Sequence, residues 1–361
     1  MPSHTHDLAQ LGLVAHDDPV RYGRFPDHKI EQMLANGPRF PMLDDAVIVC
    51  IDVEKDCSPD HLLCEIGITS VDTRNFQGRA PGDRGEDWVR QFNTQHIRVR
   101  DNPHPRALTE PFYNYYRQPR YRGNNVKHLS YCHPRSEDFA FGDTILKTLA
   151  EIPKYLDDKW LNWRRPTPGK RDTPGATPRN IILVVWDSNM EVQTLQDLNL
   201  GHWLDECHTL IDFQGYDAAS AIQPHYHTNR KEKLGLSRML TAFAIPTNIN
   251  GVEITHNGGN DSALELQVYL ASILISQKQF GQLCAQGYLD IAKDKKTASY
   301  GQVRHIQRNR QRARDMHATF EAEQRKRESD RRLAARRRSR SPVRYVTQTH
   351  HRRRTPPPVQ W

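Results

Sequence analysis

Two carboxylates lie two residues apart at the end of an apolar segment that has the composition of a buried β-strand. Asp52 and Glu54 follow the run that begins at Ala46 and reads Ala-Val-Ile-Val-Cys-Ile. Side chains at positions i and i+2 of a strand point to the same face, and two carboxylates there are costly without compensating positive charge. A divalent metal ion, which prefers carboxylate oxygen, would compensate both. The pair therefore indicates a metal site; the alternative is a solvated strand end.

A third carboxylate follows a histidine later in the chain. His256 precedes Asp261 by five residues, and a tight turn is expected at residues 258–260, Gly-Gly-Asn. Asp261 opens an apolar helix predicted over residues 261–276, so its side chain would point into the domain as a metal ligand. His256, on a glycine-flanked loop, would act as a general base. The alternative is that Asp261 or Asn260 only caps the helix and His256 is an ordinary loop residue.

The other apolar segments predict the sheet that must hold these residues. The runs and alternations typical of strands lie at residues 46–54, 62–71, 96–100, 180–186 and 210–213. Further helical spacing lies at residues 144–156, 189–198 and 232–243. Hairpin strands followed by strand–helix–strand crossovers predict an α/β fold, a mixed five-stranded sheet with helices on both faces.

Composition divides the chain into a body and a basic tail. We expect an irregular leader at 1–40, a domain at 41–280 with an Arg- and Tyr-rich insertion at 101–140, and a tail at 281–361. Residues 301–361 hold 18 Lys or Arg against 5 Asp or Glu, which leaves 33 basic and 38 acidic residues elsewhere. An acidic body with a basic, apolar-poor tail predicts a partly helical or disordered segment that contacts a partner.

Together the acidic motifs resemble those of the DEDDh exonucleases, ribonuclease-H-like enzymes that remove nucleotides from 3′ ends with two metal ions. Asp52-x-Glu54, followed on the second strand by Glu65-Ile-Gly-Ile, is similar to their first motif. His256-x-x-x-x-Asp261 before a helix is similar to their third motif. The resemblance covers about residues 42–278, and it implies a ribonuclease-H-like fold.

One branch of these enzymes is more similar than the family in general. In a fungal branch associated with mRNA export and RNA silencing, a Phe-Gly pair precedes the first helix, as Phe141-Gly142 does here. The string from His256 to Ala263 is also similar to the string that ends the site in that branch. This resemblance implies a role in RNA metabolism.

The middle motif departs from the family pattern. That pattern places Gly-His-Asp or Gly-His-Asn after the fourth strand and an Asp about five residues beyond the His. Here Trp186 occupies the His position and Glu191 the Asp position, while Asp187 is a second candidate if the register differs. Both acids could instead only match the charge of a helix N-terminus. A domain that binds RNA or protein without cutting is therefore the alternative function.

The resemblance implies metal-dependent 3′–5′ exonuclease chemistry, with RNA as the expected substrate. Two Mg²⁺ or Mn²⁺ ions about 4 Å apart would bridge the carboxylates. One ion would lower the pKa of the attacking water, and the other would stabilise the leaving 3′ oxygen. His256 would take the proton of that water. The implied ligands are Asp52, Glu54, Asp261 and either Glu191 or Asp187.

Two segments have the composition of nucleic-acid-binding surfaces. Within the insertion, Tyr115, Arg117, Arg120 and Arg122 combine stacking faces with charges that pair with phosphate, as in single-stranded RNA binders. The alternative is a packed loop. In the tail, residues 336–338 (Arg336, Arg337 and Arg338) predict phosphate binding, nuclear import or a protein partner. The alternative there is a solvated end without a dedicated partner.

Cysteine usage and the first residues indicate a compartment. The six cysteines are scattered and form no Cys-x-x-Cys pair, which is typical of reduced thiols. The polar start carries no apolar stretch of signal-peptide length, and no run of about 18 apolar residues predicts a membrane span. We therefore expect an intracellular protein, nuclear or nucleo-cytoplasmic, with no membrane partner.

Overall fold

The fold is that of a computed structural model of the chain, which divides into two compact units, Met1–Ala313 and Arg314–Trp361. The predicted leader and all of the insertion except its ends lie outside the described residues. The structure describes residues 46–55, 61–76, 79–82, 85–102, 136–166, 178–215, 217–226, 234–249, 252–275, 277–290 and 300–339.

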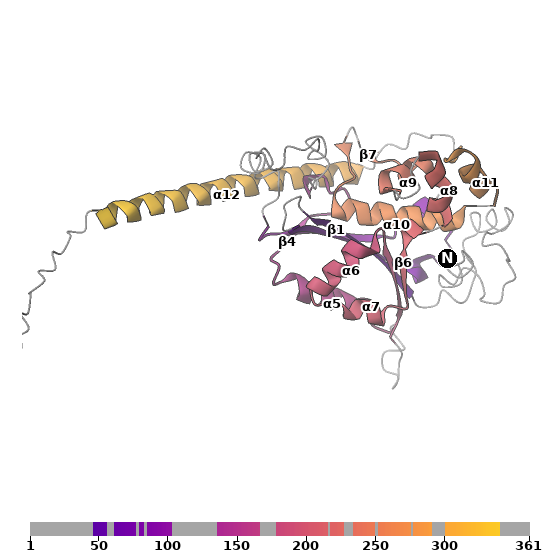
Figure 1. Cartoon of the computed structure of the whole chain (residues 1–361), viewed down its shortest axis with the longest axis horizontal. Helices are drawn as coiled ribbons and strands as arrows, with labels where there is room; N and C mark the ends of the chain where they lie inside the picture. Colours follow the sequence, from indigo (N-terminus) through magenta and orange to yellow (C-terminus); the bar gives the residue numbers. More distant parts are fainter. Residues whose placement is uncertain are drawn as a thin grey trace, which may run out of the picture. The chain divides into compact units, whose positions relative to one another are not determined.

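A mixed sheet of six strands forms the centre of the first unit (Figure 1). Strands β1, β2 and β3 pair antiparallel, β5 and β6 continue from β1 in parallel, and β4 is parallel to β3. In spatial order the strands are β4 (Ile145–Lys147), β3 (Asn93–Val99), β2 (Leu63–Asp72), β1 (Ala46–Lys55), β5 (Asn180–Val185) and β6 (Thr209–Asp212). The predicted α/β class with a mixed sheet is confirmed.

Strand β1 is buried on both faces, as its continuous apolar sequence predicts. The odd-numbered residues from 47 to 53 belong to one buried cluster, whereas Ile48 and Cys50 belong to the other. Because side chains alternate along a strand, Asp52 and Glu54 continue the face of Ile48 and Cys50. Helix α10 (Gly258–Leu274) packs on β1, β2 and β3 and shares the buried cluster of Ile48. The two acids therefore share the face of the sheet that α10 covers.

Helices cover both faces of the sheet, as predicted (Figure 1). The face of α10 also carries α8 (Asp217–Tyr226), α9 (Leu236–Ala242) and α11 (Gln277–Gln286). The opposite face carries α5 (Ile152–Arg164), α6 (Ser188–Asp197) and α7 (His202–Glu206). The shorter elements are α3 (Glu86–Val89), three 3-10 turns (Thr73–Phe76, Ser136–Asp138 and Phe213–Gly215) and a hairpin of β7 (Asn248–Ile249) and β8 (Val252–Glu253).

The helix predicted over residues 144–156 is wrong in its first half. Ile145–Lys147 form the short strand β4, which pairs in parallel with residues 97–99 of β3. A turn follows, in which the backbone N–H of Thr148 donates to the carboxylate of Glu151 at 2.8 Å, and α5 begins only at Ile152. Apolar residues at helical spacing across the strand and the turn produced the error. The sheet therefore has six strands rather than the five that we predicted.

The tight turn predicted at residues 258–260 is the first turn of helix α10. Asn257 caps the helix, because its side-chain oxygen accepts from the backbone N–H of Asn260 at 3.0 Å. Gly67 of β2 and Gly259 of the helix allow α10 to pack closely on the sheet. A Cβ added to Gly67 would lie 1.7 Å from the carbonyl oxygen of Gly258. A Cβ added to Gly259 would lie 2.6 Å from the Cβ of His96. Helix α10 thus meets the sheet backbone to backbone.

The buried core continues past residue 280, where we expected the tail to begin. Leu283 of α11, Leu289 and Ile306 all belong to the cluster on the α10 face. Residues 300–339 form helix α12 (Tyr300–Ser339), and residues 340–361 lie outside the described part. The helix predicted over 232–243 is described from Leu236 to Ala242 as α9. Among the described residues, no helix combines the length and apolar character that a membrane span requires.

The contact between β2 and α10 predicts a large effect of one methyl group. Gly67→Ala is expected to destabilise the fold by on the order of 3 kcal/mol, because backbone atoms, not a rotatable side chain, oppose the new Cβ. Urea unfolding followed by circular dichroism would measure this. Gly281→Ala in α11 is the matched control: nothing lies within 4 Å of that Cβ, so it should stabilise by about 0.5–1 kcal/mol. Similar effects of the two substitutions would contradict the prediction.

Candidate active site

Three carboxylates from two distant parts of the chain meet at one end of α10. Asp52 and Glu54 come from the last residues of β1, and Asp261 comes from the first turn of α10. One ligand oxygen from each of the three lies within 4.8 Å of the other two. The first and third sequence motifs are therefore adjacent in space, although about 200 residues separate them.

The strand pairing and the helix packing together bring these side chains into one place. In the β1–β2 ladder, Asp52 lies opposite Gly67 and Glu54 lies opposite Glu65. Because Gly67 has no side chain, the first turn of α10 approaches directly over that point. A Cβ added to Gly258 would be only 3.4 Å from Oδ2 of Asp52. The carboxylate of Asp52 thus lies beside the N-terminus of α10, where the helix dipole favours negative charge.

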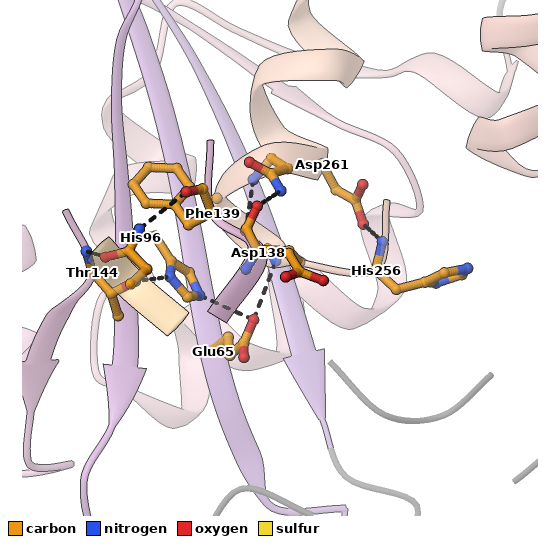
Figure 2. Close-up of polar contacts among 12 residues, drawn as sticks. Glu65, His96, Asp138, Phe139, Thr144, His256 and Asp261 are labelled. Carbon is orange, nitrogen blue, oxygen red and sulfur yellow. Dashed lines mark hydrogen bonds and ion pairs between the residues drawn. The ribbon is translucent and has the colours of Figure 1, made fainter. Parts of the chain in front are cut away.

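A strained residue holds one oxygen of Asp261. His256 has a φ of +61°, a left-handed conformation that non-glycine residues rarely adopt, and its backbone N–H donates to Oδ2 of Asp261 at 2.8 Å. Figure 2 shows the imidazole of His256 pointing away from the Asp261 carboxylate, and this side chain is exposed. The described geometry therefore gives His256 a backbone contact with the site, whereas its role as a general base stays a prediction.

The remaining oxygens of the cluster fit a cation. Oδ2 of Asp52 and Oδ1 of Asp261 are buried and accept no hydrogen bond from the described residues. Asp261 as a whole residue is only 7% exposed. Buried polar atoms are normally satisfied, and carboxylate oxygens that are not satisfied by donors are suitable ligands for a hard divalent ion. The donor set of Asp52, Glu54 and Asp261 thus fits Mg²⁺ or Mn²⁺.

Burial, together with the crowding of negative charge, raises the pKa of each of these groups. Burial, and then the charges of Glu265 and Glu54, hold the pKa of Asp52 well above its usual range. Burial and the charge of Asp261 do the same to the pKa of Glu54. Burial raises the pKa of Asp261 to about 8, against the lowering effect of the His256 N–H. Without a bound cation the cluster therefore favours protonated carboxyl groups near neutral pH.

The two candidates for the middle acid occupy different environments. Glu191, in the first turn of α6, is 2% exposed, and burial with the charge of Asp187 raises its pKa to about 8. Its own charge in turn raises the pKa of Asp52 and Glu54. Asp187 is the N-cap of α6, and its side chain accepts from the backbone N–H of Asn189 at 3.4 Å. Glu191 thus shares the electrostatic environment of the cluster, while Asp187 caps a helix.

Two further acids at the site were not predicted as site residues from the sequence. Glu265 lies one turn after Asp261 on α10, is buried, and accepts from the thiol of Cys50 at 3.4 Å. Burial and the charge of Glu191 hold the pKa of Glu265 well above its usual range. Its only sequence signal was an acid in the apolar interior of the helix, one turn after Asp261. The other acid, Glu65, belonged to the motif that we recognised, but no ligand or catalytic role was predicted for it.

Glu65 is paired with a histidine that the sequence analysis missed. Nε2 of His96 lies 3.0 Å from Oε2 of Glu65, and Nδ1 of His96 lies 2.9 Å from the hydroxyl of Thr144 (Figure 2). Both Glu65 and His96 are fully buried. The pairing of β2 with β3 places His96 opposite Gly67 and Arg98 opposite Glu65. His96 reaches the site because of this register. The strand sequence alone does not show which residue of the neighbouring strand His96 faces, so its role was not predicted.

The residues predicted to bind nucleic acid are described only in part. Tyr115, Arg117, Arg120 and Arg122 lie outside the described residues. Residues 336–338 are part of helix α12, and the placement of their side chains is not described.

Comparison with known families agrees with the geometry of the site. A family model described as DNA polymerase III subunit epsilon-like, C-terminal domain, of the DEDDh class, matches residues 47–110 and 112–272. The chain belongs to the DEDDh family. The matched DEDDh segment includes Asp52, Glu54, Glu191 and Asp261, together with the whole sheet except the start of β1. No curated protein matches the chain.

The raised pKa values predict an unusual pH dependence of the metal-free DEDDh domain. With folded-state pKa values of about 8 for Asp261 and Glu191, the folded protein binds more protons than the unfolded chain between about pH 4 and pH 8. Stability should therefore fall as pH rises through this window. We expect the melting temperature in EDTA to decrease from pH 5 to pH 8 by several degrees, and Mn²⁺ to raise it more at pH 8 than at pH 5.

Two variants separate this effect from general charge effects. Asp261→Asn removes one titrating group and should make the pH dependence shallower, whereas Asp197→Asn, at an exposed position of α6, should leave it unchanged. Identical pH profiles for Asp261→Asn and the unmutated protein, measured by thermal unfolding in EDTA, would contradict the prediction.

Proposed function

We propose that this protein is a metal-dependent 3′–5′ exonuclease that acts on single-stranded RNA. The observation that carries the proposal is the convergence of Asp52, Glu54 and Asp261 within 4.8 Å, with buried oxygens that no described donor satisfies. Membership of the DEDDh family supports nuclease chemistry in this position.

The proposed cofactor is a pair of Mg²⁺ or Mn²⁺ ions. Asp52, Glu54 and Asp261 would hold them, with Glu191 as the fourth carboxylate because its charge raises the pKa of Asp52 and Glu54. When bound, such ions supply a nucleophilic water at neutral pH and stabilise charge on the leaving oxygen. The protein contributes a fixed frame, since Asp261 is anchored by the backbone of His256 and Asp52 lies beside the first turn of α10.

His256 is the proposed general base. A ring nitrogen of its imidazole would accept the proton from the attacking water, because histidine titrates near neutral pH and stays unprotonated in a useful fraction of molecules. The hydrogen bond from its backbone to Asp261 ties the residue to the metal-binding carboxylates, and the side chain is exposed to incoming substrate.

The RNA preference and the cellular setting are the finer parts of the proposal. The basic tail would supply phosphate affinity, the Arg- and Tyr-rich insertion would supply stacking, and the tail would also contact a protein partner. The similarity of residues 256–263 to the fungal branch associated with mRNA export and RNA silencing supports a role in RNA metabolism. The same basic clusters support the proposal of a nuclear or nucleo-cytoplasmic location.

The second candidate function is binding of RNA or protein without cleavage. It is favoured by Trp186, which fills the position of the family histidine and packs in the core against Phe213 at 5.3 Å between ring centroids. It is also favoured by the longer side chain of Glu191 at the Asp position, since metal-assisted reactions tolerate little displacement of a ligand.

A cleavage assay decides between the two functions. Purified protein with 5′-labelled single-stranded RNA and Mg²⁺ or Mn²⁺ should yield a ladder of products shortened from the 3′ end. Asp52→Ala should lower the rate by more than about a hundredfold, since even partners of metal ligands are worth 10–100-fold. His256→Ala should lower it by about a hundredfold or more. No cleavage by the unmutated protein with either metal, given intact folding, would sink the enzyme proposal.

The identity of the fourth carboxylate has its own test. Glu191→Gln should lower the cleavage rate by more than about a hundredfold, since it removes the ligand charge while keeping the side-chain shape. Asp187→Asn should stay within a few-fold of the unmutated rate, because asparagine caps helices as well as aspartate does. The opposite ranking of the two variants would assign the role to Asp187.

The contribution of the tail can be read from salt dependence. RNA affinity of the full chain should fall steeply with ionic strength, by a slope of about 0.7 per phosphate contact on a log–log plot. Replacing the three arginines at 336–338 by alanine should reduce that slope by about 2, whereas replacing all three by lysine should preserve it. Fluorescence anisotropy with labelled RNA measures both, and a slope unaffected by the alanine variant would remove these arginines from the RNA contact.

A further inference from the structure

The start of helix α12 is hydrogen-bonded to the loop that precedes β4. Asn309, 3% exposed, donates from its side-chain amide to the carbonyl oxygens of Phe139 and Gly142, each at 3.0 Å. Its side-chain oxygen accepts from the backbone N–H of Thr144 at 3.2 Å. One buried side chain therefore satisfies three backbone groups of a six-residue stretch, and both donors of its amide are used.

Charged contacts surround this buried amide. Arg310 donates to the buried carboxylate of Asp138 at 2.7 Å, and Arg308 donates to Asp143 at 3.0 Å. Ile306, one turn before Arg310, is buried in the main core. All these residues belong to the first compact unit, so the beginning of α12 is part of the domain that carries the site.

The same loop is bonded on its other side to the residue next to a proposed metal ligand. Asn260 accepts from the backbone N–H of Ala140 at 2.9 Å and donates to the carbonyl oxygen of Asp138 at 3.0 Å. Asn260 is fully buried and directly precedes Asp261 in the first turn of α10. Figure 2 shows residues 138 and 139 beside the start of this helix. The loop thus lies between α12 and Asp261.

A second set of contacts leads from the loop toward Glu65 and Glu54. The hydroxyl of Thr144, whose backbone N–H is held by Asn309, lies 2.9 Å from Nδ1 of His96. Nε2 of His96 then contacts Glu65, which is opposite Glu54 in the β1–β2 ladder. The ring of Phe139 packs against His96 with 5.2 Å between centroids. The loop is therefore connected both to the residue before Asp261 and to the residue opposite Glu54.

We propose that Asn309 is a positioning residue for the carboxylate cluster: it fixes the loop at 138–144, and the loop sets Asp261 through Asn260 and Glu65 through His96. The proposal rests on the proposed function in that the cluster binds divalent metal. It assigns the first turns of α12, which sequence composition places in the tail, to the support of the site. Asn309 touches neither metal nor substrate.

The experiment measures Mn²⁺ binding to the full chain by titration calorimetry. Asn309→Ala should weaken Mn²⁺ affinity about tenfold, the lower end of what partners of metal ligands contribute. Thr144→Val, which keeps the backbone N–H and the side-chain shape but removes the hydroxyl beside His96, should shift affinity in the same direction. Gln307→Ala, at an exposed position of the same helix, is the matched control and should bind as the unmutated protein does.

Affinity separates positioning from a purely structural role, which would lower the melting temperature without changing Mn²⁺ binding well below it. Unchanged Mn²⁺ affinity in folded Asn309→Ala would overturn the proposal. If Asn309→Ala does not fold, unchanged affinity in Thr144→Val would overturn it.

A second measurement keeps this inference distinct from the proposed function. Hydrogen exchange of the metal-free protein should be faster in Asn309→Ala, or in Thr144→Val where the alanine variant does not fold, at residues 138–144 and at the amide of Asp261. If the unmutated protein binds no Mn²⁺, the proposed function fails, and exchange alone decides the positioning. Faster exchange at both places supports it; unchanged exchange at Asp261 overturns it.

Discussion

Repulsion among buried carboxylates is the constraint on which the architecture of the site depends. Burial raises the pKa of five acids at the site, which are Asp52, Glu54, Glu191, Asp261 and Glu265, and the charges of Glu191 and Asp261 raise the pKa of the other three further. The compensation within the described residues is partial. It includes the His256 N–H on Asp261, the N-terminus of α10 beside Asp52, the Cys50 thiol on Glu265 and the charge of Lys55, which lowers the pKa of Glu191. With all its members ionised, such a group of acids needs a compensating positive charge, and without one some of its carboxyl groups stay protonated near neutral pH.

The geometry that collects these acids comes from a contact made without side chains. Gly67 and Gly258 bring the backbone of β2 against the first turn of α10, so a helix ligand can stand over the end of β1. Asn257 and Asn260 then orient that turn, the first as its cap and the second through its bonds to residues 138 and 140. The acids define the chemistry, while small and amide residues define where the acids can meet.

Long apolar segments and paired motifs were readable from the sequence. Strand β1, strand β5 and helix α10 each carry enough consecutive apolar residues to indicate burial, and the acidic motifs at their ends indicated one site. Short elements could not be predicted from the sequence. The apolar residues within 145–147 and those that follow them are spaced as in a helix, but residues 145–147 form a strand because they pair with β3. His96 and Asn309 carried no local signature, because their roles exist only through contacts with residues 31 and 170 positions away.

The lengths of the outer strands have a consequence for how the protein behaves in concentrated solution. The two edges of the sheet are its shortest strands, β4 with three residues and β6 with four, whereas the long strands β1 and β2 lie in the interior. An edge strand offers unpaired backbone groups to a second chain, and a short one offers few. The same arrangement that centres the acids on a long strand thus leaves little template for intermolecular β-pairing.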